Sequence, residues 1–440
     1  EILRCLVGSE MCIRDRYTYD DKYVLSGSIR WDRSNLWGTN SKYQNKPLWS
    51  VGGSWNIYKE KFFQADFVDM LKLRASYGIG GNIGRNTAPY LIASYYDSSL
   101  VDGMAGSVNT PPNKDIRWEK TTTVNVGVDF ALFRHRLSGT IEYYNKYSVD
   151  LLAAINGSPT QGFGYTTLMT NNGKMVNRGV EITLSGEIIR QKDFSWNASL
   201  LYAFNRNKVK HISVQPSLWD SRISMPTSYP MVGKPLYGIY AYKWAGLNEN
   251  GDPQVYDAEN NVTSGPARDY HALVYCGTTV PIHNASLTNV LRYKGFEFSA
   301  MLILDAGHKL RSSNIPSINM SNGRITSTAK GIVDRWTQPG DVTDVPRLLF
   351  SNDTENFNTH RTELYRYSDL FVYDASNIRL SNISLAYRVP AHWCKKISLS
   401  GARLQFNVEN VATFAFDSKA NYDLGGKVKP NYVWGLYLNF

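Results

Sequence analysis

The chain has 440 residues, of which 42% are hydrophobic and 20% are charged, so it is neither a disordered segment nor a bundle of membrane helices. Its longest apolar runs, such as residues 151–155, are far shorter than the roughly 20 residues that a spanning helix needs. Lysine and arginine exceed the acidic residues by 48 to 38, but they are scattered, which argues against nucleic-acid binding. Only β-structure could still carry such a chain across a bilayer.

The first sixteen residues differ from the rest of the chain. The segment EILRCLVGSEMCIRDR (1–16) holds two of the four cysteines, does not begin with methionine and lacks the layout of a signal peptide. It also follows no period that recurs later in the chain. We predict that residues 1–16 are a non-native leader, produced by a sequencing or assembly error, and that the barrel portion comprises residues 17–440. An irregular natural segment is the alternative.

Apolar and polar residues alternate along most of the chain after residue 17. In residues 124–130, for example, valine and phenylalanine alternate with asparagine, glycine and aspartate. This period of two is typical of strands that have one apolar and one polar face. The best helical candidate is the short segment 59–70. We predict about 14 strands, at 22–33, 46–57, 70–79, 119–132, 136–147, 175–189, 194–205, 236–246, 253–260, 284–293, 295–306, 377–389, 396–409 and 431–440.

Short and long connections alternate between the predicted strands. Short turns are expected at 133–135, 190–193, 248–252, near 294 and at 390–395. Long connections are expected at 80–118, 148–174, 206–235, 261–283, 307–376 and 410–430. An antiparallel meander with its turns on one side and its long loops on the other is typical of an outer-membrane barrel. A soluble sandwich or propeller has no reason to sort its loops in this way.

The alternation also predicts which side chains face lipid. In the hairpin 119–147, Asn125, Asp129 and Glu142 should face the lumen. The residues expected to face lipid are Val124, Val126, Val128, Leu137, Ile141 and Tyr143.

The last predicted strand ends on an aromatic residue. Tyr432, Trp434, Leu436, Leu438 and Phe440 occupy alternate positions up to the final residue. We interpret these five residues as the signal that the outer-membrane assembly machinery reads, and an ordinary final strand is the alternative.

No catalytic or metal-binding motif stands out in the sequence. There is no GxSxG, HExxH, P-loop or CxxC motif, and the seven histidines show no metal-ligand spacing. We therefore predict no catalytic residue, no metal site and no cofactor. We interpret the glycine-rich segment 78–84 as a flexible loop, residues 248–252 as a tight turn and residues 334–341 as a structured loop. The respective alternatives are a phosphate-binding loop, a calcium-binding loop and a ligand contact.

A cluster of aromatic residues near residue 240 has two interpretations. Tyr237, Tyr240, Tyr242 and Trp244 could pack at the membrane interface, as aromatic girdles do. They could instead stack on sugar rings inside the lumen. The sequence does not choose between the two, because it does not show which rings point inward.

Seven segments follow one another in an order that has a known counterpart. They are LKLRASYGIGGNIG (71–84), NKDIRWEKTTTVNVGVD (113–129), NNGKMVNRGVEITLSGEII (171–189), GKPLYGIYAYKWAGLNENGDP (233–253), RYKGFEF (292–298), DRWTQPGDVTDVPRL (334–348) and DASNIRLSNISLAYRVP (374–390). In this order they resemble the barrel of SusC/RagA-type TonB-linked outer-membrane proteins. The resemblance implies an all-β fold, namely the C-terminal portion of an antiparallel transmembrane barrel of ~22 strands. The plug and N-terminal domains of that family are absent from this chain. These strands alone should therefore not close the barrel, and strand 431–440 should have an unpaired edge.

The resemblance also implies a function. The expected role is TonB-dependent uptake of an oligosaccharide or a peptide across the cell outer membrane, without enzymatic activity. Its expected partners are a SusD-like surface lipoprotein, the TonB complex acting through a plug that this chain lacks, outer-membrane lipid and the assembly machinery, but no nucleic acid. An outer-membrane hydrolase barrel and a soluble sugar-binding β-protein are the alternatives. The residues that contact a substrate are not predicted.

Overall fold

The computed structural model describes residues 9–33, 40, 47–82, 89–100, 103–156, 160, 167–214, 216, 220–265, 267, 269–320, 328–350, 359–396, 398–424 and 429–440. The chain divides into two compact units. Unit 1 comprises residues 1–215, 231–235 and 285–294, and unit 2 comprises residues 216–230, 236–284 and 295–440.

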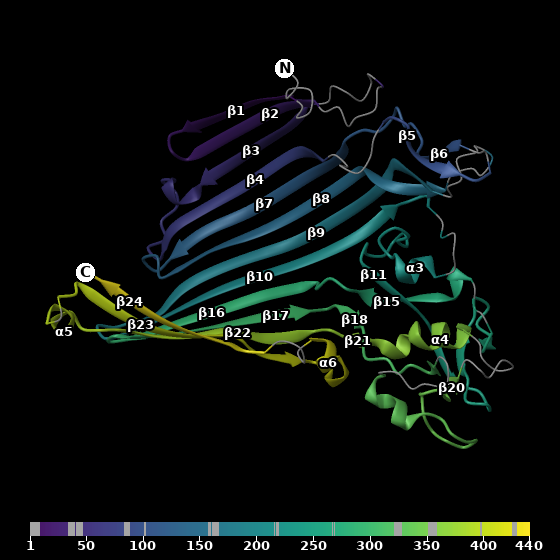
Figure 1. The fold of residues 1–440 in the computed structure, drawn as a ribbon. Coiled ribbons are helices and arrows are strands. Elements are labelled where there is room, and N and C mark those ends of the chain that lie inside the picture. Colours follow the sequence, from purple (N-terminus) through teal and green to yellow (C-terminus); the bar gives the residue numbers. More distant parts are fainter. Residues whose placement is uncertain are drawn as a thin grey trace. The chain divides into compact units, whose positions relative to one another are not determined.

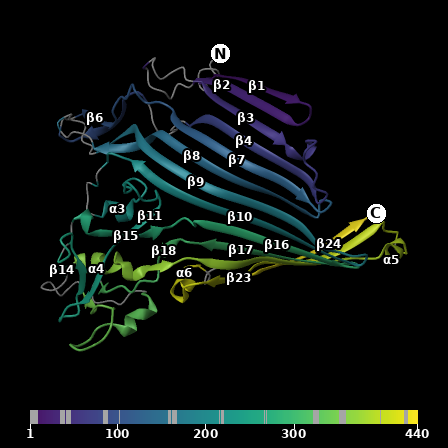
Figure 2. The ribbon, with the colours of Figure 1, turned by 180° about the vertical axis from the view of Figure 1, so that it is seen from behind.

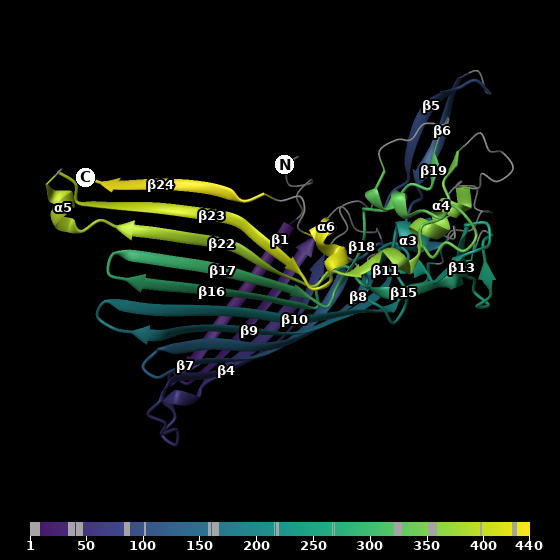
Figure 3. The same cartoon turned by 90° about the horizontal axis from the view of Figure 1, so that it is seen from below.

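Thirteen strands form one hydrogen-bonded order, β1-β2-β3-β4-β7-β8-β9-β10-β16-β17-β22-β23-β24. Those of unit 1 are β1 (Ser9–Tyr19), β2 (Tyr23–Arg33), β3 (Leu48–Asn56), β4 (Val68–Asn82), β7 (Glu119–Leu132), β8 (Leu137–Asn156), β9 (Thr167–Arg190), β10 (Phe194–His211) and most of β16 (His283–Tyr293) (Figure 1). Those of unit 2 are β17 (Phe296–Ala306), β22 (Asn377–Arg388), β23 (Gly401–Ala415) and β24 (Asn431–Asn439) (Figure 3). The predicted all-β, antiparallel fold class is confirmed, and β1 and β24 are the open ends of this order.

The pairing register separates apolar from polar side chains in unit 1, where β1 to β4 and β7 to β10 lie side by side (Figure 2). Val126 pairs with Ala75 of β4 and with Tyr143 of β8, and Val128 pairs with Ile141. Because directly paired residues share a face and neighbours alternate, the six residues predicted to face lipid lie on one face. Asn125, Asp129 and Glu142 lie on the other, so the predicted partition is confirmed.

Aromatic rings gather on the apolar face at the short-turn ends of unit 1. The ring centroids of Tyr19 and Tyr23 lie 6.5 Å apart, and those of Tyr23 and Trp55 lie 6.4 Å apart. Phe67 and Phe133 stack near the neighbouring turn, with 6.0 Å between centroids. Such rings are typical of the aromatic girdle at one edge of a barrel's apolar band.

Two predicted strands do not belong to the thirteen-stranded sheet. Segment 236–246 forms β11 (Gly238–Tyr242) and β12 (Trp244–Leu247), and segment 253–260 contains β13 (Pro253–Tyr256). These strands pair in small sheets with β15 (Leu273–Thr278) and β14 (Val262–Thr263). The turn at 248–252 therefore joins β12 to β13 inside the long connection between β10 and β16. Local alternation predicts a strand but not its sheet, which depends on remote partners. The two predicted strands that lie outside the large sheet are consecutive along the chain. Short and long connections therefore still alternate between the strands that remain in the sheet.

The hairpin of β8 and β9 is longer than predicted. Leu152 pairs with Asn171, so residues 148–174 are not one long connection, and that prediction is wrong. Asn171 Nδ2 donates to the backbone oxygens of Arg117 at 2.8 Å and Asp150 at 2.7 Å. The strand register shifts between Ser148 and Leu152, and these hydrogen bonds satisfy carbonyl groups there. Strand pairing therefore continues on both sides of the irregularity.

Residues 9–16 lie within the fold, although we expected the fold to begin at residue 17. They form most of β1, which pairs with β2 from Ser9↔Arg33 to Tyr19↔Tyr23. The origin of residues 1–16 stays a prediction. The helical candidate 59–70 is wrong, because residues 60–67 contain no helix. A 3-10 turn (Ile57–Lys59) and β4, which begins at Val68, overlap its two ends.

The long connections contain most of the remaining elements, and α5 (Ala391–Lys395) lies in the predicted short turn at 390–395. Unit 1 has the hairpin of β5 (Ile92–Ser98) and β6 (Gly103–Thr110). Unit 2 has α3 (Ser221–Ser224), β18 (Lys309–Arg311), β19 (Asn319–Met320), β20 (Leu349–Phe350), α4 (Thr359–Arg366), β21 (Val372–Asp374), α5, α6 (Asn421–Leu424) and 3-10 turns at Tyr270–Ala272, Lys330–Asp334, Asp369–Phe371 and Ser418–Ala420. In the described part of the chain, no helix has the length and hydropathy that a membrane span requires.

The meander predicts where a protease can act. We expect protease added to intact cells that express the full-length protein to cleave within residues 83–118, 212–282 and 307–376, identified by mass spectrometry of the fragments. The turn at 191–193, which joins β9 to β10, should be cleaved only after the cells are permeabilised. Cleavage at 191–193 in intact cells would show that the topology is inverted.

Candidate functional site

An ion cluster lies on the polar face of unit 1. Arg74 Nη2 of β4 donates to Asp129 Oδ1 of β7 at 3.0 Å and also to Glu142 Oε1 of β8. Thr140 Oγ1 donates to Asp129 Oδ1 at 3.1 Å, and Asn125 Nδ2 donates to Glu142 Oε2 at 3.3 Å. One guanidinium thus joins two carboxylates across three strands. The sequence analysis assigned Asp129 and Glu142 to this face but did not assign Arg74. Arg74 alternates with Lys72 and Ser76 along the same strand, and this polar alternation could have indicated its face.

Small residues line two hollows on the same polar face. The hollows have volumes of about 460 and 530 Å³, extend over β1 to β4 and reach β7, and Arg14 of β1 lines both. Ser28 Oγ and Ser50 Oγ share a hydrogen bond of 2.7 Å, and a Cβ at Gly78 would lie 2.7 Å from the Cβ of Ser50. Such a Cβ does not fit, so glycine is required where β3 and β4 approach.

The glycine-rich segment 78–84 is not a flexible loop as predicted. Gly78, Gly80 and Gly81 lie in β4 and pair with β7 from Thr123 to Lys120. Residues 83 and 84 lie outside the described residues. The glycines serve close packing, because a Cβ at Gly81 would lie 2.7 Å from the ring of Trp118.

The long connections of unit 2 form a packed body with its own core. Ile318, Tyr365 and Phe371 are buried together, and Trp244 packs against them. The rings of Tyr365 and Phe371 meet edge to face, with centroids 4.8 Å apart. Trp244 N donates to Asp369 Oδ1 at 2.9 Å. The connection that contains β11 to β15 is therefore packed against the one that contains α4.

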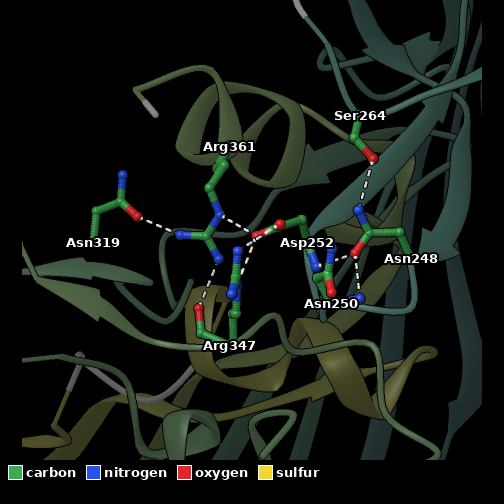
Figure 4. A network of polar contacts seen from close by, with 7 residues as sticks. All are labelled: Asn248, Asn250, Asp252, Ser264, Asn319, Arg347 and Arg361. Atoms are coloured by element: carbon green, nitrogen blue, oxygen red, sulfur yellow. Dashed lines mark hydrogen bonds and ion pairs between the residues drawn. The ribbon is translucent and has the colours of Figure 1, made fainter. Parts of the chain in front are cut away.

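Asp252 links these two connections through two arginines (Figure 4). Arg361 Nε donates to Asp252 Oδ1 at 2.6 Å, and Arg347 Nη2 donates to Asp252 Oδ2 at 2.8 Å. The Arg361 side chain is only 3% exposed, and its other nitrogens donate to Asn319 Oδ1 at 2.6 Å and Arg347 O at 2.8 Å. Burial lowers the pKa of Arg361, whereas the Asp252 carboxylate raises it in part. Asp252 is the carboxylate that compensates this buried charge.

The prediction of a tight turn at 248–252 is confirmed. Asn248 Oδ1 accepts hydrogen bonds from Asn250 N and Asp252 N, both at 2.9 Å. Gly251 has a φ of +75°, and a Cβ there would lie 2.4 Å from the ring of Trp336. Only glycine suits both the left-handed backbone and the close ring.

The prediction of a structured loop at 334–341 is also confirmed. Asp341 Oδ2 accepts hydrogen bonds from Thr337 N at 2.8 Å and Gln338 N at 3.0 Å. The hydrogen bonds from Thr337, followed by that from Gln338, hold the pKa of Asp341 below its usual value. Trp336 belongs to this loop, so the loop packs directly on the turn of Gly251.

Neither interpretation of the aromatic cluster holds for Tyr240 and Tyr242. Both lie in β11 and are 1% exposed, so they contact neither lipid nor a solute. Tyr242 Oη donates to Ala267 O at 2.9 Å, and burial raises the pKa of Tyr242. Trp244 Nε1 donates to Asp344 Oδ1 at 3.0 Å while its ring packs on Tyr365. These residues hold the body of unit 2 together.

The proposed assembly residues lie on and just after β24. Tyr432, Trp434, Leu436 and Leu438 share one face, and Trp434 pairs with Phe406 of β23 at 4.2 Å between centroids. Phe440 is 93% exposed. Among the described strands β24 pairs with β23 alone, so the expected unpaired edge is present. The role of these residues in assembly stays a prediction.

Metal-ligating and nucleophilic side chains do not converge in the described part of the chain. No group of three or more His, Cys, Asp or Glu residues there could hold a metal ion. Cys276 is a free thiol in β15, and burial raises its pKa to about 11. A thiol with so high a pKa is a poor nucleophile at neutral pH.

The TonB dependent receptor-like, beta-barrel family matches residues 11–411. The chain belongs to this family. TonB-dependent receptor P3 of Formosa agariphila is 27% identical over 451 residues, which cover 96% of this chain and 43% of that protein. TonB-dependent receptor SusC of Bacteroides thetaiotaomicron is 25% identical over 419 residues, which cover 90% of this chain and 39% of that protein.

The structure of the RagAB peptide transporter has the same fold, with a TM-score of 0.78 at 23% identity. That match covers 98% of this chain and 47% of the transporter chain. The chain thus spans less than half the length of the relatives that it matches. The proteins of this family are receptors of the outer membrane, and the contrast between an apolar and a polar face in unit 1 is typical of the wall of an outer-membrane barrel.

Proposed function

We propose that this chain supplies barrel wall to an outer-membrane, TonB-dependent importer of an oligosaccharide or a peptide. Family membership carries the proposal, together with the contrast between the two faces of unit 1. On the polar face, the hydroxyls of Ser28 and Ser50 and the cluster of Arg74, Asp129 and Glu142 offer hydrogen-bond partners to a polar solute. A solute that exchanges hydrogen bonds along such a wall can pass without meeting apolar surface.

The packed body of unit 2 suits the same role. The connections that contain β13 and α4 are held together by Asp252 and by the core around Tyr365. A preorganised loop body presents a defined surface to a substrate without a large entropy cost on binding. The peptide named for the RagAB transporter supports a peptide as one candidate substrate.

The proposed partners follow from the same family relationship. They are a SusD-like surface lipoprotein, the TonB complex acting through a plug domain, lipid of the outer membrane and the assembly machinery that would read Tyr432 to Phe440. The likeness to SusC and to RagAB supports the first two.

Uptake by cells tests this proposal. Deletion of the gene should abolish uptake of one member of a panel of labelled oligosaccharides and peptides, and the full-length gene should restore it. A protonophore should block the restored uptake, because TonB-dependent import needs the proton gradient of the inner membrane. Uptake that is unchanged by the deletion would refute the proposal. Hydrolysis of a panel member by the purified full-length protein would favour the alternative of a hydrolase barrel.

A further inference from the structure

The outer face of β9 and β10 changes from apolar to basic toward the long connections. On β10, the alternate residues from Trp196 to Phe204 are apolar, and the next two on the same face are Arg206 and Lys208. The nine residues from Trp196 to Phe204 span roughly 30 Å of strand, which at the usual tilt fills the ~25 Å apolar band of a barrel. The basic residues therefore begin where the band ends.

The pairing register brings the basic residues of both strands together. Phe204 pairs with Val180 in the last apolar row, and Arg206 pairs with Arg178 in the next. Lys208 follows two residues after Arg206 on the same face, and Lys174 of β9 pairs with His211 one row farther on. We name Lys174, Arg178, Arg206 and Lys208 the basic patch; all four are exposed.

The basic patch lacks acidic partners among the residues that the structure describes. None of its four residues forms an ion pair with a carboxylate in the described part of the chain, and Arg178 Nε donates only to Asn145 Oδ1 at 3.0 Å. Like charges directly opposite each other on paired strands destabilise a sheet. An anion between Arg178 and Arg206 would remove this repulsion.

Aromatic residues place the patch at the membrane surface. Pairing across β4, β7, β8, β9 and β10 puts Tyr77 in the row of Arg178 and Arg206. Tyr147 lies in the row of Lys208 and is 40% exposed. Tyrosine and tryptophan rings concentrate at the level of the lipid headgroups. Because barrel strands tilt, a row changes level as it crosses them. The nearby tyrosines, together with the end of the apolar run at Phe204, place the basic patch at the edge of the apolar band, on the lipid side of the barrel.

We propose that the basic patch binds the phosphate groups of a phosphorylated glycolipid headgroup in the leaflet on the long-loop side. Clusters of lysine and arginine at a membrane surface attract anionic headgroups, with each cation adding to the affinity. Asn145 and Thr122 lie on the same face, because Asn145 pairs with Val124 and Thr122 pairs with Tyr147. Their side chains offer hydrogen bonds to sugar hydroxyls. The inference depends on the outer-membrane location of the family and not on the proposed transport.

Lipid binding by the full-length protein tests the proposal. The purified, delipidated protein is titrated with bisphosphorylated lipid A in detergent, and bound lipid is counted by native mass spectrometry. The double variant Arg178→Gln, Arg206→Gln should bind ~30-fold more weakly than the wild type, because two surface cations are lost. The matched double variant Arg190→Gln, Lys192→Gln removes the same charge at the short-turn end of the same strands and should bind as the wild type does. Heat-modifiable migration in gels checks that each variant is folded.

Three outcomes would overturn the proposal. Equal affinity of the wild type and the Arg178→Gln, Arg206→Gln variant would show that the patch does not bind the lipid. Equal affinity for lipid A and its dephosphorylated form would show that the phosphates are not recognised. Complete displacement of the lipid by millimolar inorganic phosphate would identify a free-anion site instead. Loss of binding at high salt supports the proposal, since salt screens exposed charges.

Discussion

Replacing Asp252 by asparagine should lower the free energy of local unfolding of the connections that contain β13 and α4 by about 3–5 kcal/mol. The reason is that the buried guanidinium of Arg361 would lose its counter-charge. Hydrogen exchange of the full-length protein measures the effect. Backbone amides of β13 and α4 should exchange more than ~100-fold faster in the variant, since each 1.4 kcal/mol corresponds to a factor of ten. Strand amides of unit 1 should be unchanged.

Asp257→Asn is the matched control for this prediction. Asp257 lies in the same connection, but among the described residues its carboxylate accepts only local hydrogen bonds from Asn261, including Asn261 N at 2.7 Å. Its replacement should speed exchange in its own turn and leave α4 protected. A further change, Arg361→Met in the Asp252→Asn protein, should restore part of the protection because it removes the uncompensated charge. Unaltered exchange in α4 of the Asp252→Asn variant would show that Asp252 does not link the two connections.

Replacing Val126 by arginine should cost up to about 2–4 kcal/mol, the cost of a charge at the middle of the apolar band, because the arginine would enter the lipid. Val126 lies on the apolar face between Ala75 and Tyr143 and is 46% exposed before lipid covers it. The measurement is the urea midpoint of the heat-modifiable form of the full-length protein in liposomes.

Asn125→Arg is the control for Val126→Arg, because it adds the same side chain at the adjacent position on the polar face. There the new guanidinium lies near the Glu142 carboxylate, to which Asn125 now donates, so the cost should be small. A larger loss for Asn125→Arg than for Val126→Arg would show that the lipid and lumen faces are exchanged.

The sequence by itself determined the local features of the barrel wall. The alternation around Val126 predicted β7 with its bounds and the faces of its side chains, because alternate residues of any strand point to opposite sides. The turn at 133–135 and the glycine turn at 248–252 were equally predictable, since both depend on a few adjacent residues. Arg74 could have been assigned to the polar face by the same reasoning.

Only the tertiary structure decided which strands share a sheet and which charges meet. Segment 236–246 alternates like a barrel strand, yet β11 is buried on both faces in the body of unit 2. Asp252 and Arg361 are 109 positions apart, and neither neighbourhood predicts the other. The same holds for Arg178 and Arg206, which oppose each other only through the register of β9 and β10. The physical reason is that side-chain alternation follows from the backbone of a few neighbouring residues, whereas pairing and burial depend on remote segments that folding brings together.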